Sequence, residues 1–221
     1  MIQLRAISRD YEVGNRPVHA LSHLDLSIAR GEYFSIMGPS GSGKSTLLNI
    51  IGCLDRPTAG SYMLDGREVA HLGENDLTLV RRHKIGFIFQ SFHLVPRLTA
   101  AGNVELPMVF AGIEKGERSD RADRALEAVG LSQRADHRPE QLSGGERQRV
   151  AVARAIVMGP SILLADEPTR NLDSESGGEI VRLIEKMNSD GLTLLVVTHD
   201  PAIGSRAGSQ IRLADGYTSN K

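Results

Sequence analysis

The chain has 221 residues, with 26 basic and 27 acidic side chains and a formal net charge of −1. This length suits one domain, or a core with a smaller lobe, and is enough to bury a substantial core. The balanced charge does not favour a nucleic acid partner, because such partners select basic surfaces. Cys53 is the only cysteine, which excludes an internal disulfide and a cysteine-based zinc site and favours a reducing compartment.

Long apolar segments are missing from the sequence. The first residues lack the apolar stretch of a signal peptide, and no run of about 18 apolar residues follows. We therefore expect that this chain does not span a membrane alone, so that any membrane role requires a partner chain.

Apolar patterning predicts alternating strands and helices. Up to residue 90, we expect strands at 2–7, 18–28, 33–37, 61–64 and 85–89, a turn at 14–17, a helix beginning at 47 and a helix at 74–83. The pattern then becomes helical, with helices expected at 98–112 (interrupted by Pro107), 116–130 and 146–157. Strands at 161–166 and 192–198, a helix at 177–189 and a hairpin at 211–217 complete the chain. The prediction is an α/β fold with a parallel core, a small antiparallel β lobe and an inserted helical lobe.

A phosphate-binding loop organises these elements. Its residues are Gly38, Pro39, Ser40, Gly41, Ser42, Gly43, Lys44, Ser45 and Thr46, and they fit the pattern G-x-x-x-x-G-K-[ST] at every fixed position. Glycines let backbone N–H groups turn toward phosphate oxygens, and the following helix adds its positive dipole. Lys44 is then expected to contact the outer phosphates and Ser45 to ligate Mg²⁺. The alternative, a glycine-rich turn with a chance lysine, does not account for the flanking strand and helix.

Two carboxylates follow the apolar strand at 161–166. Asp166 stands where a Mg²⁺-organising carboxylate belongs beside a phosphate loop. Glu167 is the next residue and can accept a proton from an attacking water. An ordinary acidic strand end is the alternative explanation.

A small, polar helix start is predicted after Leu142. Ser143 is a helix-capping residue type, Gly144 and Gly145 leave N–H groups uncovered, and Glu146 lies in the first turn. Such a helix start binds anions, although a routine capped helix explains the same residues.

The segment 142–146 resembles the signature motif of ATP-binding cassette (ABC) ATPases. Together with the phosphate loop and the strand ending at Asp166, it identifies the chain as a member of that superfamily over essentially its whole length. The resemblance implies a P-loop NTPase fold with a RecA-like parallel core. We expect a single ABC ATPase domain over 1–221, with a core lobe at about 1–90 and 160–221 and a helical subdomain at about 91–159.

The resemblance also implies roles for isolated residues. Tyr11 corresponds to the residue that stacks on adenine, Gln90 to the glutamine that contacts Mg²⁺ or the attacking water, and His199 to the switch histidine at the γ-phosphate. Asp173 belongs to the loop that crosses between two cassettes. A partly exposed core tyrosine, a solvated glutamine and a structural histidine are the alternatives. Arg170 replaces the glycine common in related subunits, which affects the expected cassette interface.

In this family two cassettes bind head to tail. By resemblance, each ATP, with Mg²⁺, lies between Lys44 and Ser45 of one chain and Ser143 and Gly145 of the other, and a homodimer is the simplest arrangement. Hydrolysis then powers a separate membrane permease, with this chain peripheral at the cytoplasmic face. The segments 50–58 and 102–107 resemble the branch that includes lipoprotein-releasing, macrolide-export and peptide-export subunits.

The loop after Gln90 carries four apolar side chains, and two interpretations of it stay open. Its residues Phe92, Leu94, Val95 and Leu98 either dock a permease helix or form local core.

Other functional classes fit less well. Soluble ABC ATPases that act on ribosomes or DNA typically carry two cassettes or long coiled-coil insertions, whereas this chain has one phosphate loop, one signature and no heptad array. A small-molecule kinase does not account for the signature or for His199. A regulatory module without turnover is disfavoured because Glu167 and His199 are both present.

Overall fold

The computed structural model describes residues 1–14 and 16–219, which form two compact units. The first unit comprises Met1–Arg81 and Thr193–Lys221, and the second comprises Arg82–Leu192. None of the helices within the described ranges combines the length and the apolar character that a membrane span requires.

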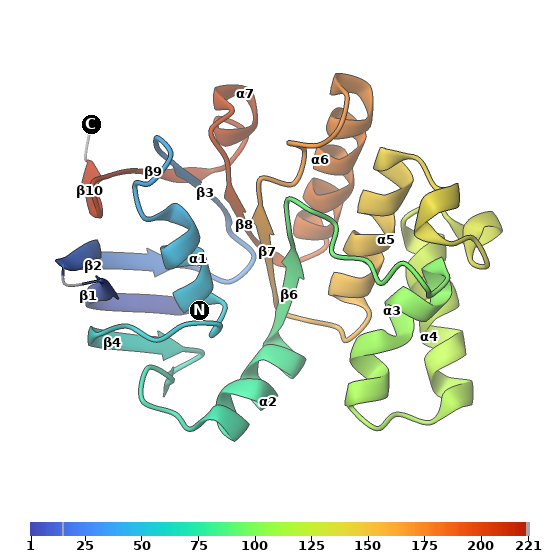
Figure 1. Ribbon diagram of the computed structural model, residues 1–221, viewed down its shortest axis with the longest axis horizontal. Coiled ribbons are helices and arrows are strands. Elements are labelled where there is room, and N and C mark those ends of the chain that lie inside the picture. The colour runs from blue at the N-terminus through green and yellow to red at the C-terminus, as the bar shows by residue number, and fades with distance from the viewer. Residues whose placement is uncertain (15, 220–221) are drawn as a thin grey trace. The chain divides into compact units, whose positions relative to one another are not determined.

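An antiparallel sheet with the strand order β2-β1-β4-β5 forms one part of the first unit. Its strands are β1 (Ile2–Val13), β2 (Arg16–Ile28), β4 (Ala59–Leu64) and β5 (Arg67–Glu68). In β2 the buried residues Leu24, Leu26 and Ile28 alternate with exposed ones, as expected of a sheet covered on one face. Figure 1 shows β1, β2 and β4 side by side, with helix α1 (Lys44–Ile51) next to them.

Parallel strands form the other part of the first unit. Strand β3 (Tyr33–Met37) pairs in parallel with β8 (Thr193–Val197) and with β9 (Ser209–Ala214), and β9 forms a hairpin with β10 (Tyr217–Ser219). All residues of β8 are buried, which is typical of a parallel strand covered on both faces. Helix α7 (Pro201–Gly204) follows β8. The phosphate loop therefore leaves the end of a strand that has neighbours on both sides.

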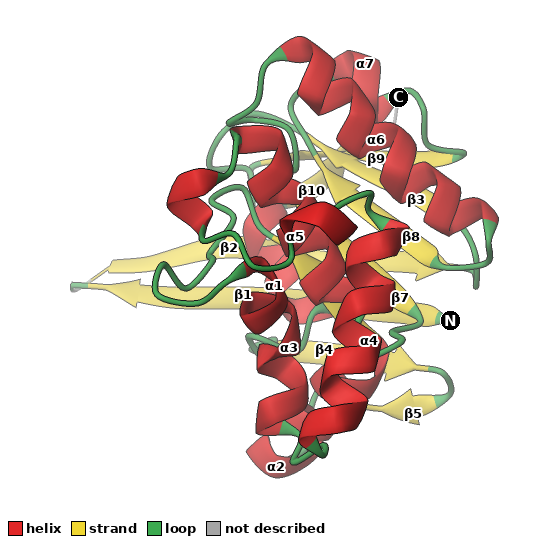
Figure 2. Cartoon of the chain, turned by 90° about the vertical axis from the view of Figure 1, so that its right-hand side faces the viewer, coloured by secondary structure: helices red, strands yellow, loops and turns green. Residues whose placement is uncertain are grey.

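The second unit combines two parallel strands with a helical layer. Helix α2 (Glu74–Lys84) leads into β6 (Ile85–Ile88), which pairs with β7 (Ile162–Asp166). The helices are α3 (Ala100–Phe110), α4 (Lys115–Ala128), α5 (Gly144–Ile156) and α6 (Ser174–Ser189), with 3₁₀ turns at Ser132–Arg134 and Pro139–Gln141. Figure 2 shows α3, α4 and α5 as neighbours, and α5 also contacts α6 and β6.

A glycine allows α5 to approach β6 closely. A Cβ atom on Gly86 would lie only 2.4 Å from the carbonyl oxygen of Ala155. The helix that begins with the signature motif therefore packs directly on the strand that precedes Gln90.

The predicted α/β element order is confirmed, and several boundaries are corrected. Strand β1 continues to Val13 because its half-exposed residues still pair with β2 through the backbone. Pro107 does not interrupt its helix: it lies inside α3, three residues before the end, where it removes one backbone donor. Helix α7 was not predicted, and α1 begins at Lys44 because Gly43 caps it. Asn15 of the predicted turn lies outside the described residues.

Candidate active site

The phosphate loop depends on two glycines that lie against other strands. Gly38 and Gly43 have φ values of 149° and 97°, in the region that favours glycine. A Cβ atom on Gly38 would lie 2.2 Å from the Leu213 carbonyl oxygen, and one on Gly43 would lie 2.4 Å from the Ala20 carbonyl oxygen. The loop therefore curls against β9 and β2 with no room for side chains at these two positions.

Lys44 is enclosed by this loop. It is the first residue of α1 and is 9% exposed, and its Nζ donates hydrogen bonds to the carbonyl oxygens of Gly38 (2.9 Å) and Pro39 (2.7 Å). Ser42 is buried, and within the described residues its Oγ has no hydrogen-bond partner. A buried cation and an unsatisfied hydroxyl beside a helix N-terminus fit an anionic ligand such as a phosphate group.

Tyr11 and His199 belong to the same unit as the phosphate loop. Tyr11 is half-buried on β1, opposite Val18 of β2. His199 is exposed and lies two residues after β8. Asp200 follows it and caps α7, since its Oδ1 accepts a hydrogen bond from the Ala202 N–H at 2.8 Å. This cap fixes the chain direction immediately after His199.

The two carboxylates lie at the end of β7 in the second unit. Asp166 is the last residue of the strand, and Glu167 follows with a φ of 46°. A non-glycine residue in this region costs of order 1 kcal/mol and is found mainly at turns and functional sites. Gln90 follows the parallel neighbour β6, so Gln90, Asp166 and Glu167 all lie at or just after the carboxyl ends of adjacent strands.

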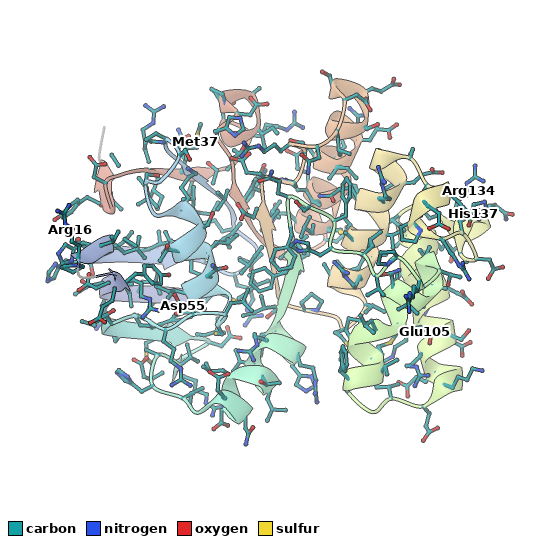
Figure 3. The ribbon with its side chains drawn as sticks, viewed as in Figure 1. Arg16, Met37, Asp55, Glu105, Arg134 and His137 are labelled. Carbon is teal, nitrogen blue, oxygen red and sulfur yellow. The ribbon has the colours of Figure 1, made fainter. Side chains whose placement is uncertain are left out.

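The signature motif forms a complete capping box. Ser143 Oγ accepts a hydrogen bond from the Glu146 N–H (3.2 Å), and the Glu146 carboxylate accepts one from the Ser143 N–H (2.8 Å). The Ser143 N–H lowers the pKa of the Glu146 carboxyl, and Arg134, which contacts Glu146 at 3.1 Å, lowers it further. Figure 3 shows Arg134 beside His137, with which it shares a 3.1 Å hydrogen bond.

The signature glycines pack against the segment that contains Asp173. Gly144 lies against Leu172, and a Cβ atom on Gly145 would be 3.1 Å from the Ser176 side chain. Asp173 caps α6, and the N–H of Ser176, which donates to it at 2.9 Å, lowers the pKa of the Asp173 carboxyl. The side chain of Asn171 donates to the carbonyl oxygen of Gln90 at 2.9 Å. One network therefore joins the signature, the Asp173 loop and Gln90.

The residues expected to bind Mg²⁺ offer oxygen donors but no cluster of acidic side chains. Within residues 1–14 and 16–219, no group of three or more His, Cys, Asp and Glu side chains is placed to hold a metal ion. The Mg²⁺ ligands expected from the sequence include one such residue, Asp166, and the other two are the hydroxyl of Ser45 and the amide of Gln90. Oxygen donors of these types suit Mg²⁺, which retains several waters and binds to substrate phosphates.

The predicted site residues are divided between the units. The first unit holds Tyr11, the phosphate loop and His199, and the second holds Gln90, the signature, Asp166, Glu167 and Asp173. Sequence reasoning missed Arg9 and Asp55, which contact Tyr11, and Gln148, which contacts Pro168. Gln148 carries a usable signal, because it is a polar residue on the buried side of an otherwise apolar helix face.

Comparisons with known proteins agree with this fold and identify the family. The family model described as "ABC transporter" matches residues 21–170. The macrolide export ATP-binding/permease protein MacB 1/2 of Paracoccus denitrificans is 50% identical over 98% of this chain and 32% of its own length. The uncharacterized ABC transporter ATP-binding protein YknY of Bacillus subtilis is 50% identical over 98% of this chain and 94% of its own length.

A solved structure extends the comparison. The ATP-binding cassette MJ0796, in a dimeric post-hydrolysis state bound to ADP and Pi, superposes with a TM-score of 0.91 and 47% identity over 100% of this chain and 97% of its own. Fold and site together define a P-loop NTPase of the ATP-binding cassette type. The chain belongs to the ABC transporter family and is an ATP-binding cassette of the ABC ATPase type. It spans about a third of the length of the MacB relative.

Proposed function

We propose that this chain is the ATPase subunit of a transporter whose permease it powers by cycles of ATP-driven dimer closure. Two copies bind head to tail, and hydrolysis opens them again. The observation that carries the proposal is the match to a cassette solved as a dimer with ADP and phosphate. The chain is a single ATPase domain with a helical subdomain at about 91–159.

Binding of ATP begins at the phosphate loop. Lys44 Nζ exchanges its carbonyl partners for phosphate oxygens, a stronger interaction because both partners are then charged. The N–H groups of the loop and the Ser42 hydroxyl donate to the same phosphates, and Tyr11 supports the adenine. Ser45, Gln90 and Asp166 hold Mg²⁺, which when bound supplies positive charge to the β- and γ-phosphates.

Hydrolysis uses three groups around the γ-phosphate. Glu167 accepts the proton of the attacking water, Gln90 orients that water, and His199 contacts the γ-phosphate. The second copy adds the helix start at Ser143, Gly144 and Gly145, whose N–H groups and dipole face the phosphate from the other side. Asp173 and its loop line the boundary between the copies. Closure excludes water and strengthens these electrostatic interactions.

The partner is an integral membrane permease, with this chain peripheral at the cytoplasmic face of the membrane. The MacB relative is named an ATP-binding/permease protein, and this chain matches 32% of its length. Its name supports macrolide export as the transport class, and the resemblance of residues 50–58 and 102–107 extends that class to lipoprotein release and peptide export. An ABC ATPase that acts on ribosomes or DNA is the alternative.

Affinity purification tests the partner. The tagged chain is isolated from detergent-solubilised membranes of its native cell, and the co-purifying proteins are identified by mass spectrometry. A permease as the main partner supports the transport function. Ribosomal or DNA-processing proteins without a membrane protein would contradict it.

A further inference from the structure

Three side chains from two distant parts of the sequence form a closed cluster around Tyr11. The Tyr11 hydroxyl donates a hydrogen bond to Asp55 Oδ2 at 2.6 Å. Arg9 Nε donates to the same oxygen at 3.0 Å, and the Arg9 NH2 group lies 2.8 Å from Asp55 Oδ1. The Arg9 guanidinium carbon lies over the Tyr11 ring, 4.4 Å from its centroid. Each member of the cluster therefore contacts the other two.

The geometry of the cluster favours a rigid arrangement. Arg9 and Asp55 form a two-point ion pair in which the side chains are 24% and 23% exposed. Planar, two-point Arg–carboxylate pairs that are partly desolvated hold their geometry better than exposed single contacts. The neighbouring His19–Asp10 pair on the same hairpin has one contact and exposures of 64% and 41%. The Arg9–Asp55 pair is therefore partly buried and doubly bonded, whereas the neighbouring His19–Asp10 pair is exposed and has a single contact.

Asp55 connects the cluster to the helix of the phosphate loop. Helix α1 begins at Lys44 and ends at Ile51, and the N–H groups of Leu54 and Asp55 both donate to the Asn49 carbonyl oxygen, at 2.8 and 3.2 Å. The chain that leaves α1 is therefore folded back onto its last turn. Figure 3 labels Asp55 beside the strands of the antiparallel sheet.

We propose that Arg9 and Asp55 are positioning residues for the nucleobase. They fix the Tyr11 ring to the end of α1, so that one rigid element carries both the ring and Lys44. Arg9 occupies one face of the ring, and the base stacks on the opposite face. A ring that is already fixed loses less conformational entropy when the base binds, which raises affinity. This inference rests on the proposed role of Tyr11 as the adenine platform.

The test compares a ligand that has a base with one that lacks it. Calorimetry measures the affinity of ATP and of inorganic tripolyphosphate for Tyr11→Phe, Asp55→Asn and Arg9→Gln. Tyr11→Phe keeps the ring and removes only the hydroxyl. Because each variant loses at least one of the bonds that hold the Tyr11 ring, we expect ATP to bind about three- to tenfold more weakly in each, with tripolyphosphate affinity unchanged. In steady-state assays, KM for ATP rises more than kcat falls.

Controls separate positioning from folding. Asp10→Asn removes the exposed neighbouring pair and is expected to leave ATP affinity unchanged. In the variant that combines Tyr11→Phe with Asp55→Asn, the two losses of ATP affinity are expected to be less than additive, because both substitutions weaken the Tyr11–Asp55 hydrogen bond.

Three outcomes contradict the inference. Unchanged ATP affinity in all three variants overturns it, and so does an equal loss for ATP and tripolyphosphate, which indicates a structural role only. Both outcomes leave the proposed function standing. If Tyr11→Ala also binds ATP normally, the assignment of Tyr11 itself is wrong, and the inference falls with it.

Discussion

The side chain of Gln148 donates a hydrogen bond from Nε2 to the carbonyl oxygen of Pro168 at 2.7 Å, and Gln148 is completely buried. Pro168 follows Glu167, whose backbone lies in the left-handed region. Gln148 lies on α5, the helix that begins with the signature motif. The helix expected to bind the ATP of a second copy thus also supports the turn that carries the proposed catalytic carboxylate.

Replacement of Gln148 by Met tests this support. Met fills a similar volume but cannot donate, so the buried Pro168 carbonyl loses its partner at a cost of about 1–3 kcal/mol in the free energy of unfolding. We expect kcat for ATP to fall while ATP affinity is retained, because the Glu167 turn loses its orientation. Steady-state kinetics and calorimetry measure the two quantities. An unchanged kcat in a folded variant would show that the bond is structural only.

Lys44→Ala is expected to weaken ATP binding by about 10- to 100-fold, since a hydrogen bond to a charged group contributes about 1.5–3 kcal/mol. The same substitution removes the bonds that Nζ makes to Gly38 and Pro39. Calorimetry with ATP measures the loss. A normal affinity would remove Lys44 from the proposed phosphate site.

Glu167→Gln is expected to retain ATP binding and to reduce turnover by about 10²- to 10⁴-fold, the usual contribution of a general base. The amide keeps the size of the carboxylate but does not accept the proton of the attacking water. Phosphate release in the steady state measures the effect. Wild-type turnover would falsify the assignment of Glu167 as the base.

Arg154 holds the loop that follows Gln90. Its guanidinium donates to the carbonyl oxygens of His93 (2.5 Å) and Phe92 (2.8 Å), and burial lowers its pKa. Arg154→Met removes both bonds, so we expect faster hydrogen exchange at the amides of residues 91–95. Arg121→Met, which breaks only an exposed pair with Glu117, is the matched control. Equal exchange in the wild type and Arg154→Met would contradict this role.

The buried thiol of Cys53 is expected to lower the free energy of unfolding at alkaline pH. Burial raises the pKa of its thiol to about 11 from an ordinary value of 9.0. The folded chain therefore keeps a proton that the unfolded chain has lost, so stability that is fully present below pH 9 is lost as pH rises toward 11. Urea unfolding across this range should show a shallower decline for Cys53→Ala. Burial also raises the pKa of Tyr62, which therefore contributes to the slope that remains in Cys53→Ala. Identical slopes in the two proteins would contradict the assignment.

The parts of the candidate site that could be predicted are those formed by residues close together in the sequence. The phosphate loop was predictable because its glycines, Lys44 and Ser45 are adjacent in the chain and lie between a strand and a helix. The buried strands β7 and β8 were predictable from continuous apolar runs. Because β7 ends at Asp166 and β8 ends shortly before His199, the positions of these two candidate residues could also be predicted.

Long-range contacts were not predictable. Arg9 and Asp55 are 46 residues apart, and no local pattern relates them. Pro107 was expected to break its helix, but α3 continues through it because helix packing outweighs the loss of one backbone bond. Helix α7 is only four residues long and depends on the Asp200 cap rather than on periodicity.

The most direct test of the proposed function is the solution mass of Glu167→Gln with and without ATP. One chain has a mass of 24.0 kDa. Light scattering coupled to gel filtration is predicted to give this mass without nucleotide and twice this mass with ATP, because binding closes two copies around the nucleotide and hydrolysis no longer opens them. The double variant with Lys44→Ala should stay at the mass of one chain. A single-chain mass for Glu167→Gln at saturating ATP would contradict the head-to-tail dimer and the mechanism built on it.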